Sequence, residues 1–174
     1  MWKSGTLGNN LFQFKTLNKI INMVDTKELK GFIIIGISVR TTNANGKSLK
    51  DIGGLFSRFV SQKLKDEIRD KNSNDIYCVY TDYESDFNGP YTTIVGCRVS
   101  SMEHIPPGMV AKIIPDSKYQ VYQSTGKLSE CLGETWEKIW ESVIDRRYEA
   151  DFDIYGEKGL DPENAEIETF VSVN

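Results

Sequence analysis

Apolar residues recur along this chain in two alternating patterns, and each change of pattern marks a predicted element. A continuous β-branched run, GFIIIGISVRTT at residues 31–42, is typical of a buried strand. Apolar residues at helical spacing then predict a helix over residues 49–69, which begins at a sequence resembling a capping box. Residues 76–84 and 91–99 predict the two strands of a hairpin around an Asn-Gly-Pro turn.

The second half of the chain repeats this order of strand, helix, strand and strand. A strand at residues 118–124 precedes an amphipathic helix at 128–146, and strands follow at 151–156 and 166–173. The order predicts an α+β fold built from duplicated βαββ units that are related by a pseudo-two-fold axis. Two mostly antiparallel sheet halves with one helix each would leave a central cleft for a ligand.

A chain of 174 residues is expected to form one domain with a substantial core. We assign this domain to residues 25–174, with repeat one at about 25–100 and repeat two at about 108–174. Residues 1–24 form an N-terminal extension in which the apolar residues from Leu11 to Val24 follow a helical period. An exposed amphipathic helix at this end would favour a homodimer.

Composition and charge narrow the range of functions. The net charge is -4 and the basic residues are scattered, which argues against direct nucleic-acid binding. We expect a cytoplasmic protein without a membrane partner, because there is no signal peptide and no apolar run of membrane-spanning length. Three cysteines without CxxC spacing are typical of reduced, buried thiols, and Cys78 and Cys97 lie on neighbouring strands where they can face each other.

Few residues offer catalytic or metal chemistry. His104 is the only histidine, and it lies in a proline-rich loop without a nucleophile elbow nearby. The cysteines and this histidine lack metal-ligand spacing, and neither Gly46-Lys47-Ser48 nor Gly126-Lys127 completes a phosphate-binding loop. We therefore expect neither a metal nor a cofactor.

Tyrosines and acidic residues gather in the hairpin. Strand alternation places Tyr80 and Glu84 on one face and Tyr83 on the other, so Tyr80 and Glu84 are expected to share a pocket. Trp136 and Trp140 lie one helical turn apart on a common face. Aromatic rings beside a carboxylate can hold an aromatic or cationic small molecule, and the alternative is ordinary strand and core packing.

Several short motifs together resemble GyrI-like effector-binding domains, the ligand-sensing modules behind the DNA-binding heads of some AraC-type and MerR-type regulators. The resemblance is strongest to the stand-alone integron-associated effector-binding proteins, and it covers residues 25–174. The motifs are YTDYE at residues 80–84, GPY at 89–91, Gly96, IPPGM at 105–109, IP at 114–115, YQVYQSTG at 119–126, WEKIW at 136–140 and FDIYG at 152–156.

The resemblance implies an SHS2-like fold and a cleft that binds hydrophobic, often cationic, compounds. In many relatives an acidic residue of an F-E-x-Y-like strand faces the buried cation, and Asp153 occupies that position here with a side chain shorter by one methylene. Glu84 is the competing carboxylate. The expected ligand-binding residues are Tyr80, Glu84, Tyr91, Trp136, Trp140, Asp153 and Tyr155.

Three functions remain open at this point. The first is a non-enzymatic, stand-alone sensor of a small organic compound. The second is a small hydrolase of strained electrophiles, as some relatives are, with Glu84 or Asp153 as the general base and Tyr80 or Tyr155 as a hydrogen-bond donor. The third is a protein-interaction module that acts on a separate DNA-binding subunit or on an enzyme such as a topoisomerase, with the segment 11–24 as its contact helix.

Overall fold

The computed structural model describes residues 25–174, and the helix expected within residues 1–24 lies outside this range. Within the described range there are eight strands, two α-helices and two short 3-10 helices. In chain order they are β1 (Asp25–Leu29), β2 (Phe32–Thr41), η1 (Ala44–Gly46), α2 (Lys47–Ser61), η2 (Leu64–Glu67), β3 (Ile76–Thr81), β4 (Tyr91–Val99), β5 (Val110–Ile114), β6 (Ser117–Gly126), α3 (Leu128–Glu141), β7 (Ala150–Tyr155) and β8 (Ala165–Val173).

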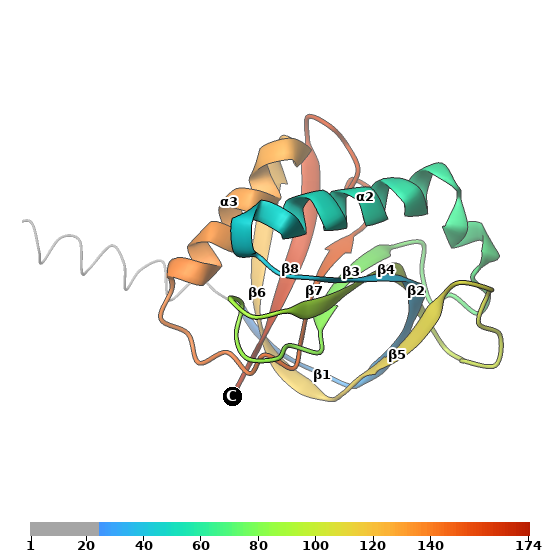
Figure 1. Ribbon diagram of the computed structural model, residues 1–174, viewed down its shortest axis with the longest axis horizontal. Coiled ribbons are helices and arrows are strands. Elements are labelled where there is room, and N and C mark those ends of the chain that lie inside the picture. Colours follow the sequence, from blue (N-terminus) through green and yellow to red (C-terminus); the bar gives the residue numbers. More distant parts are fainter. Residues whose placement is uncertain (1–24) are drawn as a thin grey trace, which may run out of the picture.

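All eight strands of residues 25–174 form one antiparallel sheet with the order β1-β6-β8-β7-β3-β4-β2-β5. The expected α+β class is therefore confirmed. The two predicted sheet halves join through the β3–β7 pair into one continuous sheet. Figure 1 shows both helices on the same side of this sheet, with β1 and β5 at the opposite side of the molecule.

The strand order has an internal symmetry. It reads the same from either end when β1 to β4 are exchanged with β5 to β8, as a pseudo-two-fold axis between β3 and β7 requires. The first strand of each half pairs with the other half, because β1 lies beside β6 and β5 lies beside β2. The two crossing segments also meet, since Asp116 accepts hydrogen bonds from the Gly31 backbone N–H and from Lys30 Nζ, both at 2.8 Å.

Each face of the sheet buries its own hydrophobic core. On the helix side, α2 and α3 bury residues such as Phe59 and Ile139 against the strands. On the other side the sheet curls around its own aromatic residues, and Phe152 stacks on Phe170 at a ring-centroid distance of 4.8 Å. Because both faces are covered, the central strand β3 is buried at every position and lacks apolar–polar alternation.

Both α-helices are shorter than their periodicity predicts. The first ends at Ser61 rather than at residue 69, because Lys63 adopts a left-handed conformation (φ 54°). The second ends at Glu141 rather than at residue 146. Ile68 and Ile144 still contribute to the helix-side core from the loops beyond, which explains why the apolar spacing continues past the helix ends. Across residues 25–174, no helix combines the length and the apolar character that crossing a membrane requires.

The three cysteines are free and buried, in agreement with packing as their role. Burial raises the pKa of the Cys97 thiol to about 11 and raises the pKa of the Cys78 thiol further. Both thiols therefore stay protonated near neutral pH.

Candidate functional site

A cavity of about 370 Å³ lies between α2 and α3, over strands β3 and β4. Tyrosines of these two strands border it, Tyr80 on β3 and Tyr91 on β4. Among residues 25–174, Arg146 is the only charged residue that borders it. The lining residues are Asn43, Ser48, Leu49, Ile52, Gly53, Tyr80, Tyr83, Phe87, Tyr91, Leu128, Ser129, Leu132, Gly133, Trp136, Trp140 and Arg146.

The two helices face the cavity with equivalent positions. Ile52 and Gly53 of α2 correspond to Leu132 and Gly133 of α3 in order and spacing. A Cβ atom built on either glycine would meet no atom within 4 Å. A glycine within a helix costs roughly 0.5–1 kcal/mol relative to alanine. Glycine at these two positions leaves the cavity open, at a cost in helix stability.

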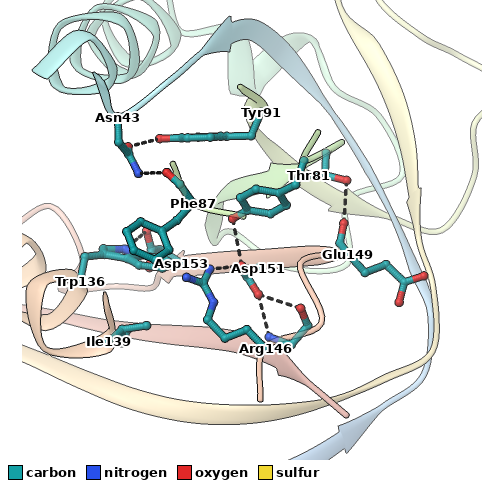
Figure 2. Close-up of polar contacts among 12 residues, drawn as sticks. Asn43, Thr81, Phe87, Tyr91, Trp136, Ile139, Arg146, Glu149, Asp151 and Asp153 are labelled. Atoms are coloured by element: carbon teal, nitrogen blue, oxygen red, sulfur yellow. Dashed lines mark hydrogen bonds and ion pairs between the residues drawn. The ribbon is translucent and has the colours of Figure 1, made fainter. Parts of the chain in front are cut away.

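Two aromatic rings bridge the hairpin turn and α3 at the cavity. Phe87 of the turn stacks on Trp140 of α3, with ring centroids 5.9 Å apart and an interplanar angle of 11°. Asn43 fixes the turn: its Nδ2 donates to the Phe87 carbonyl oxygen (2.8 Å), and its Oδ1 accepts from the Tyr91 hydroxyl (2.7 Å). Figure 2 shows both hydrogen bonds of Asn43, one to Phe87 and one to Tyr91. The position of Phe87 is thus set by the strands as well as by the turn.

A buried carboxylate lies directly behind the aromatic lining. Asp153 on β7 accepts hydrogen bonds from the Tyr80 hydroxyl (2.6 Å), from Trp136 Nε1 (3.3 Å) and from the Thr169 hydroxyl (2.6 Å). Asp153 is fully buried, and within residues 25–174 no basic side chain forms an ion pair with it. Burial therefore raises its pKa to about 6, although the three hydrogen bonds oppose this shift.

A second buried carboxylate, Asp151, pairs with the arginine of the cavity. Arg146 Nη2 lies 2.7 Å from Asp151 Oδ2, and the two side chains are only 3% and 0% exposed. The Tyr83 hydroxyl donates to the same oxygen (2.9 Å), while Ser172 donates to the other through its backbone N–H (2.7 Å) and its hydroxyl (2.8 Å). Asp151 thus holds both Arg146 and Tyr83 in place beside the cavity, as Figure 2 shows for Arg146.

The structure brings together most of the residues expected to bind a ligand. Tyr80, Tyr91, Trp136 and Trp140 line the cavity. Asp153 does not border it but contacts Tyr80 and Trp136 from behind. Tyr155 lies in the helix-side core, where its ring packs on that of Phe56 with a centroid distance of 4.7 Å. The roles of these residues in binding remain predictions.

The expected pairing of Tyr80 with Glu84 is wrong. β3 ends one residue before Asp82, and Asp82 adopts a positive φ of 51°, so strand alternation stops before Glu84 is reached. Glu84 lies at the surface, where its Oε1 is 2.7 Å from Nη2 of Arg40. Tyr83, which was expected on the opposite face, lines the cavity instead.

Tyr83, Phe87 and Arg146 are among the lining residues that escaped prediction. Tyr83 and Phe87 belong to the connection between β3 and β4, where side-chain directions depend on individual backbone dihedrals. Arg146 had been assigned to a helix end. Gly53 and Gly133 offered a usable signal, since a glycine inside an amphipathic helix usually has a packing or functional reason.

The tyrosine hydroxyl groups beside the cavity serve as hydrogen-bond donors. Burial raises the pKa values of Tyr80 and Tyr83, so both phenols stay protonated and act as hydrogen-bond donors to buried carboxylates. Aromatic faces attract cations, and Asp153 places a negative charge behind them. In the part of the chain that the structure describes, no group of three His, Cys, Asp or Glu side chains is placed to hold a metal ion.

Comparison with known sequences identifies related proteins over almost the whole described range. The sequence model for integron-associated effector-binding proteins matches residues 26–173. YobU of Bacillus subtilis (strain 168), named as a candidate transcriptional regulator, is 31% identical over 155 residues, which cover 84% of this chain and 93% of YobU.

Solved structures share the fold. The integron cassette protein VCH_CASS2, from the mobile metagenome of Vibrio cholerae, matches with a TM-score of 0.68 at 25% identity, over 87% of this chain and 95% of the cassette protein. SAV2435, solved in complex with tetraphenylphosphonium, matches with a TM-score of 0.73 at 14% identity, over 87% of this chain and 93% of SAV2435. At the latter identity the likeness is one of fold.

Proposed function

Since the chain belongs to the family of integron-associated effector-binding proteins, we propose that it is a sensor that holds an aromatic, positively charged organic compound in the cavity between α2 and α3. The observation that carries this proposal is the buried carboxylate of Asp153 behind Tyr80 and Trp136. A buried negative charge attracts a cation strongly, because little water screens the interaction.

The balance of charge around the cavity supports a cationic ligand. Arg146 and Asp151 neutralise each other at 2.7 Å, so Asp153 supplies the uncompensated charge next to the lining. Trp136 and Trp140 line the cavity, and their rings can add a cation–π contribution. Tetraphenylphosphonium, bound in SAV2435, is an aromatic cation held by a protein of the same fold.

The size of the cavity supports a single compact ligand. Its volume of about 370 Å³ lies near the lower end of the range of roughly 300–1,000 Å³ that is usual for small-molecule sites. The relation to a candidate transcriptional regulator supports an output through a separate DNA-binding or other protein partner. That partner remains a prediction, as does a homodimer.

Two ions of equal size and opposite charge test the proposal. The full chain is titrated with tetraphenylphosphonium and with tetraphenylborate by isothermal calorimetry. The cation is expected to bind at least about tenfold more tightly, because Asp153 attracts it and repels the anion. The proposal fails if neither ion binds, or if tetraphenylborate binds more tightly.

Filling the cavity from α2 is expected to weaken binding. Gly53→Leu places an isobutyl group in the cavity and should weaken tetraphenylphosphonium binding by about tenfold or more. Gly54→Leu is the matched control, because Gly54 is the next residue of the helix, has open space around its Cβ position and does not line the cavity. Isothermal calorimetry measures the tetraphenylphosphonium affinity of both variants. Equal affinities of the two variants would show that the ligand binds outside the cavity.

Glu84→Gln is expected to change little. The Arg40–Glu84 pair is solvent-exposed, so its loss should alter the free energy of unfolding by less than about 1 kcal/mol. Because Glu84 lies outside the cavity, the affinity for tetraphenylphosphonium should also stay the same. Urea unfolding and calorimetry measure both quantities. A clear loss of cation affinity would restore Glu84 as the ligand carboxylate.

A further inference from the structure

Arg146 has hydrogen-bonding capacity that the protein itself does not use. A guanidinium group carries five N–H donors, and here Nη2 donates to Asp151 while Nε and Nη1 are buried without any acceptor. In the absence of a ligand these two nitrogen atoms are covered by neighbouring protein atoms and have no water contact, so a ligand oxygen that binds them must displace a neighbouring side chain. Figure 2 shows the guanidinium group between Asp151 and the side of the cavity formed by Trp136 and Phe87.

The neighbours of Arg146 fix its position but do not accept hydrogen bonds from all of its N–H groups. Asp151 already accepts hydrogen bonds from Tyr83 and Ser172, so both of its oxygens are engaged. The guanidinium carbon lies 4.4 Å from the ring centroid of Tyr148 and 5.8 Å from that of Trp136. Aromatic faces hold a cation but offer no lone pair in the plane of its N–H groups. Arg146 is therefore held in place while its Nε and Nη1 donors lack acceptors.

We propose that the cognate compound carries an uncharged oxygen acceptor, such as a carbonyl, amide or ester oxygen, that binds to the guanidinium group of Arg146. This inference rests on the proposed function of the cavity. Buried donors of a charged group are costly when unpaired, so a ligand that supplies an acceptor gains affinity that a pure hydrocarbon cation does not.

The charges nearby favour an uncharged oxygen over a carboxylate. The charge of Arg146 is already balanced by Asp151 at 2.7 Å. Asp153 adds a second buried carboxylate, held by Tyr80 and Trp136. A ligand carboxylate would bring a further negative charge into a poorly solvated region that already contains two, whereas a neutral oxygen satisfies Arg146 without repulsion.

Three dyes with one shared scaffold test this inference. Tetramethylrosamine is an aromatic cation without a carbonyl group, tetramethylrhodamine methyl ester adds a neutral ester, and tetramethylrhodamine carries the free carboxylate. Binding to the full chain is followed by fluorescence anisotropy. The ester is expected to bind about tenfold more tightly than the rosamine, and the free acid more weakly than the ester. An ester that binds no better than the rosamine, or an acid that binds best, overturns the inference.

Variants assign the effect to Arg146. Arg146→Lys keeps a positive charge beside Asp151 but removes the planar donors, so the tenfold preference for the ester should fall to about threefold or less. Arg147→Lys is the matched control, because Arg147 is the next residue, is 46% exposed and does not line the cavity. It should keep the full preference. A preference that survives Arg146→Lys unchanged contradicts the role of Arg146.

The two proposals fail in different ways. If neither tetraphenylphosphonium nor any dye binds, the cavity is not the ligand site and the proposed function falls, and this inference falls with it. If the cations bind but the dyes show no preference for the ester, the function stands and the Arg146 inference alone is wrong. The dye comparison on the unaltered protein decides the inference even if Arg146→Lys does not fold.

Discussion

Asp153→Asn is expected to bind tetraphenylphosphonium about tenfold to a hundredfold more weakly than the native protein near neutral pH, and to be more stable without ligand. Asparagine has nearly the shape of aspartate. Its carbonyl oxygen can accept from Tyr80 and Trp136, and its amide can donate to the Thr169 hydroxyl, which then acts as an acceptor. The variant thus removes the charge with little disturbance of the packing.

The same residue makes cation binding depend on pH. Burial raises the pKa of Asp153 to about 6, so the carboxyl group is mostly charged at pH 7 and mostly neutral at pH 5. The affinity of the native protein for tetraphenylphosphonium should therefore fall as the pH drops through about 6. A bound cation favours the charged form, so binding in this range releases a proton. Asp153→Asn should show a flat profile.

The charge on Asp153 favours cation binding but lowers the stability of the folded protein. In the unfolded chain the carboxyl group has an ordinary pKa near 4, whereas in the folded protein it is about 6. Protonation therefore favours the folded state, and the contribution is fully present below the unfolded pKa and lost as the pH rises through the folded one. At pH 7 the charged, buried Asp153 costs about 3 kcal/mol, which Asp153→Asn should recover.

Urea unfolding of both proteins at several pH values measures this cost. The stability difference between Asp153→Asn and the native protein should be largest above about pH 6 and should vanish towards pH 4. Comparison at each pH removes the contribution of the other carboxyl groups. Equal stability at all pH values, together with unchanged cation affinity, would show that Asp153 is neither strained nor used in binding.

Asp151→Asn is expected to destabilise the folded protein by about 3–5 kcal/mol, because it leaves the charge of Arg146 buried and unbalanced. For a domain of this size the melting temperature should fall by roughly 6–20 °C. The amide cannot reproduce the present arrangement, in which both carboxylate oxygens accept hydrogen bonds, from Arg146 and Tyr83 on one side and from Ser172 on the other.

A double variant separates the ion pair from other effects of the substitution. Adding Arg146→Met to Asp151→Asn removes the buried charge as well, so the double variant should be more stable than Asp151→Asn alone. Glu166→Gln is the matched control, since the Lys158–Glu166 pair has the same 2.7 Å distance but is exposed at the surface. Its loss should cost less than about 1 kcal/mol. Additive effects of Asp151→Asn and Arg146→Met would contradict a coupled pair.

Much of the fold can be predicted from the hydrophobic periodicity of the sequence. The β-branched run of β2 and the helical spacing of α2 and α3 were sufficient to predict an α+β protein, because burial on a sheet or against a helix imposes those periods. Strand β1 and its pairing with β6 could not be predicted in this way, because five residues of mostly polar composition show no strand period and do not indicate a partner.

Several aromatic residues of the cavity on regular elements could be predicted, whereas those on the connection between β3 and β4 could not. Trp136 and Trp140 were placed correctly together because they share a helix face. Tyr83 was placed on the wrong side because the positive φ of Asp82 changes the direction of the chain just before it, and aspartate adopts such a dihedral only occasionally. Arg146 was missed because its burial depends on Asp151, a residue on another element.

The exchange of β1 and β5 between the halves limits the conformational changes by which ligand binding can be transmitted to a partner protein. A hinge movement of one half against the other would break the ladders that each exchanged strand forms with the opposite half, as well as the central β3–β7 pair. The exchanged strands therefore oppose a hinge movement that would widen the cavity. We therefore expect ligand selectivity to depend on the shape and charge of the cavity. We expect a partner protein to detect the bound ligand through α2, α3 or the turn that carries Phe87.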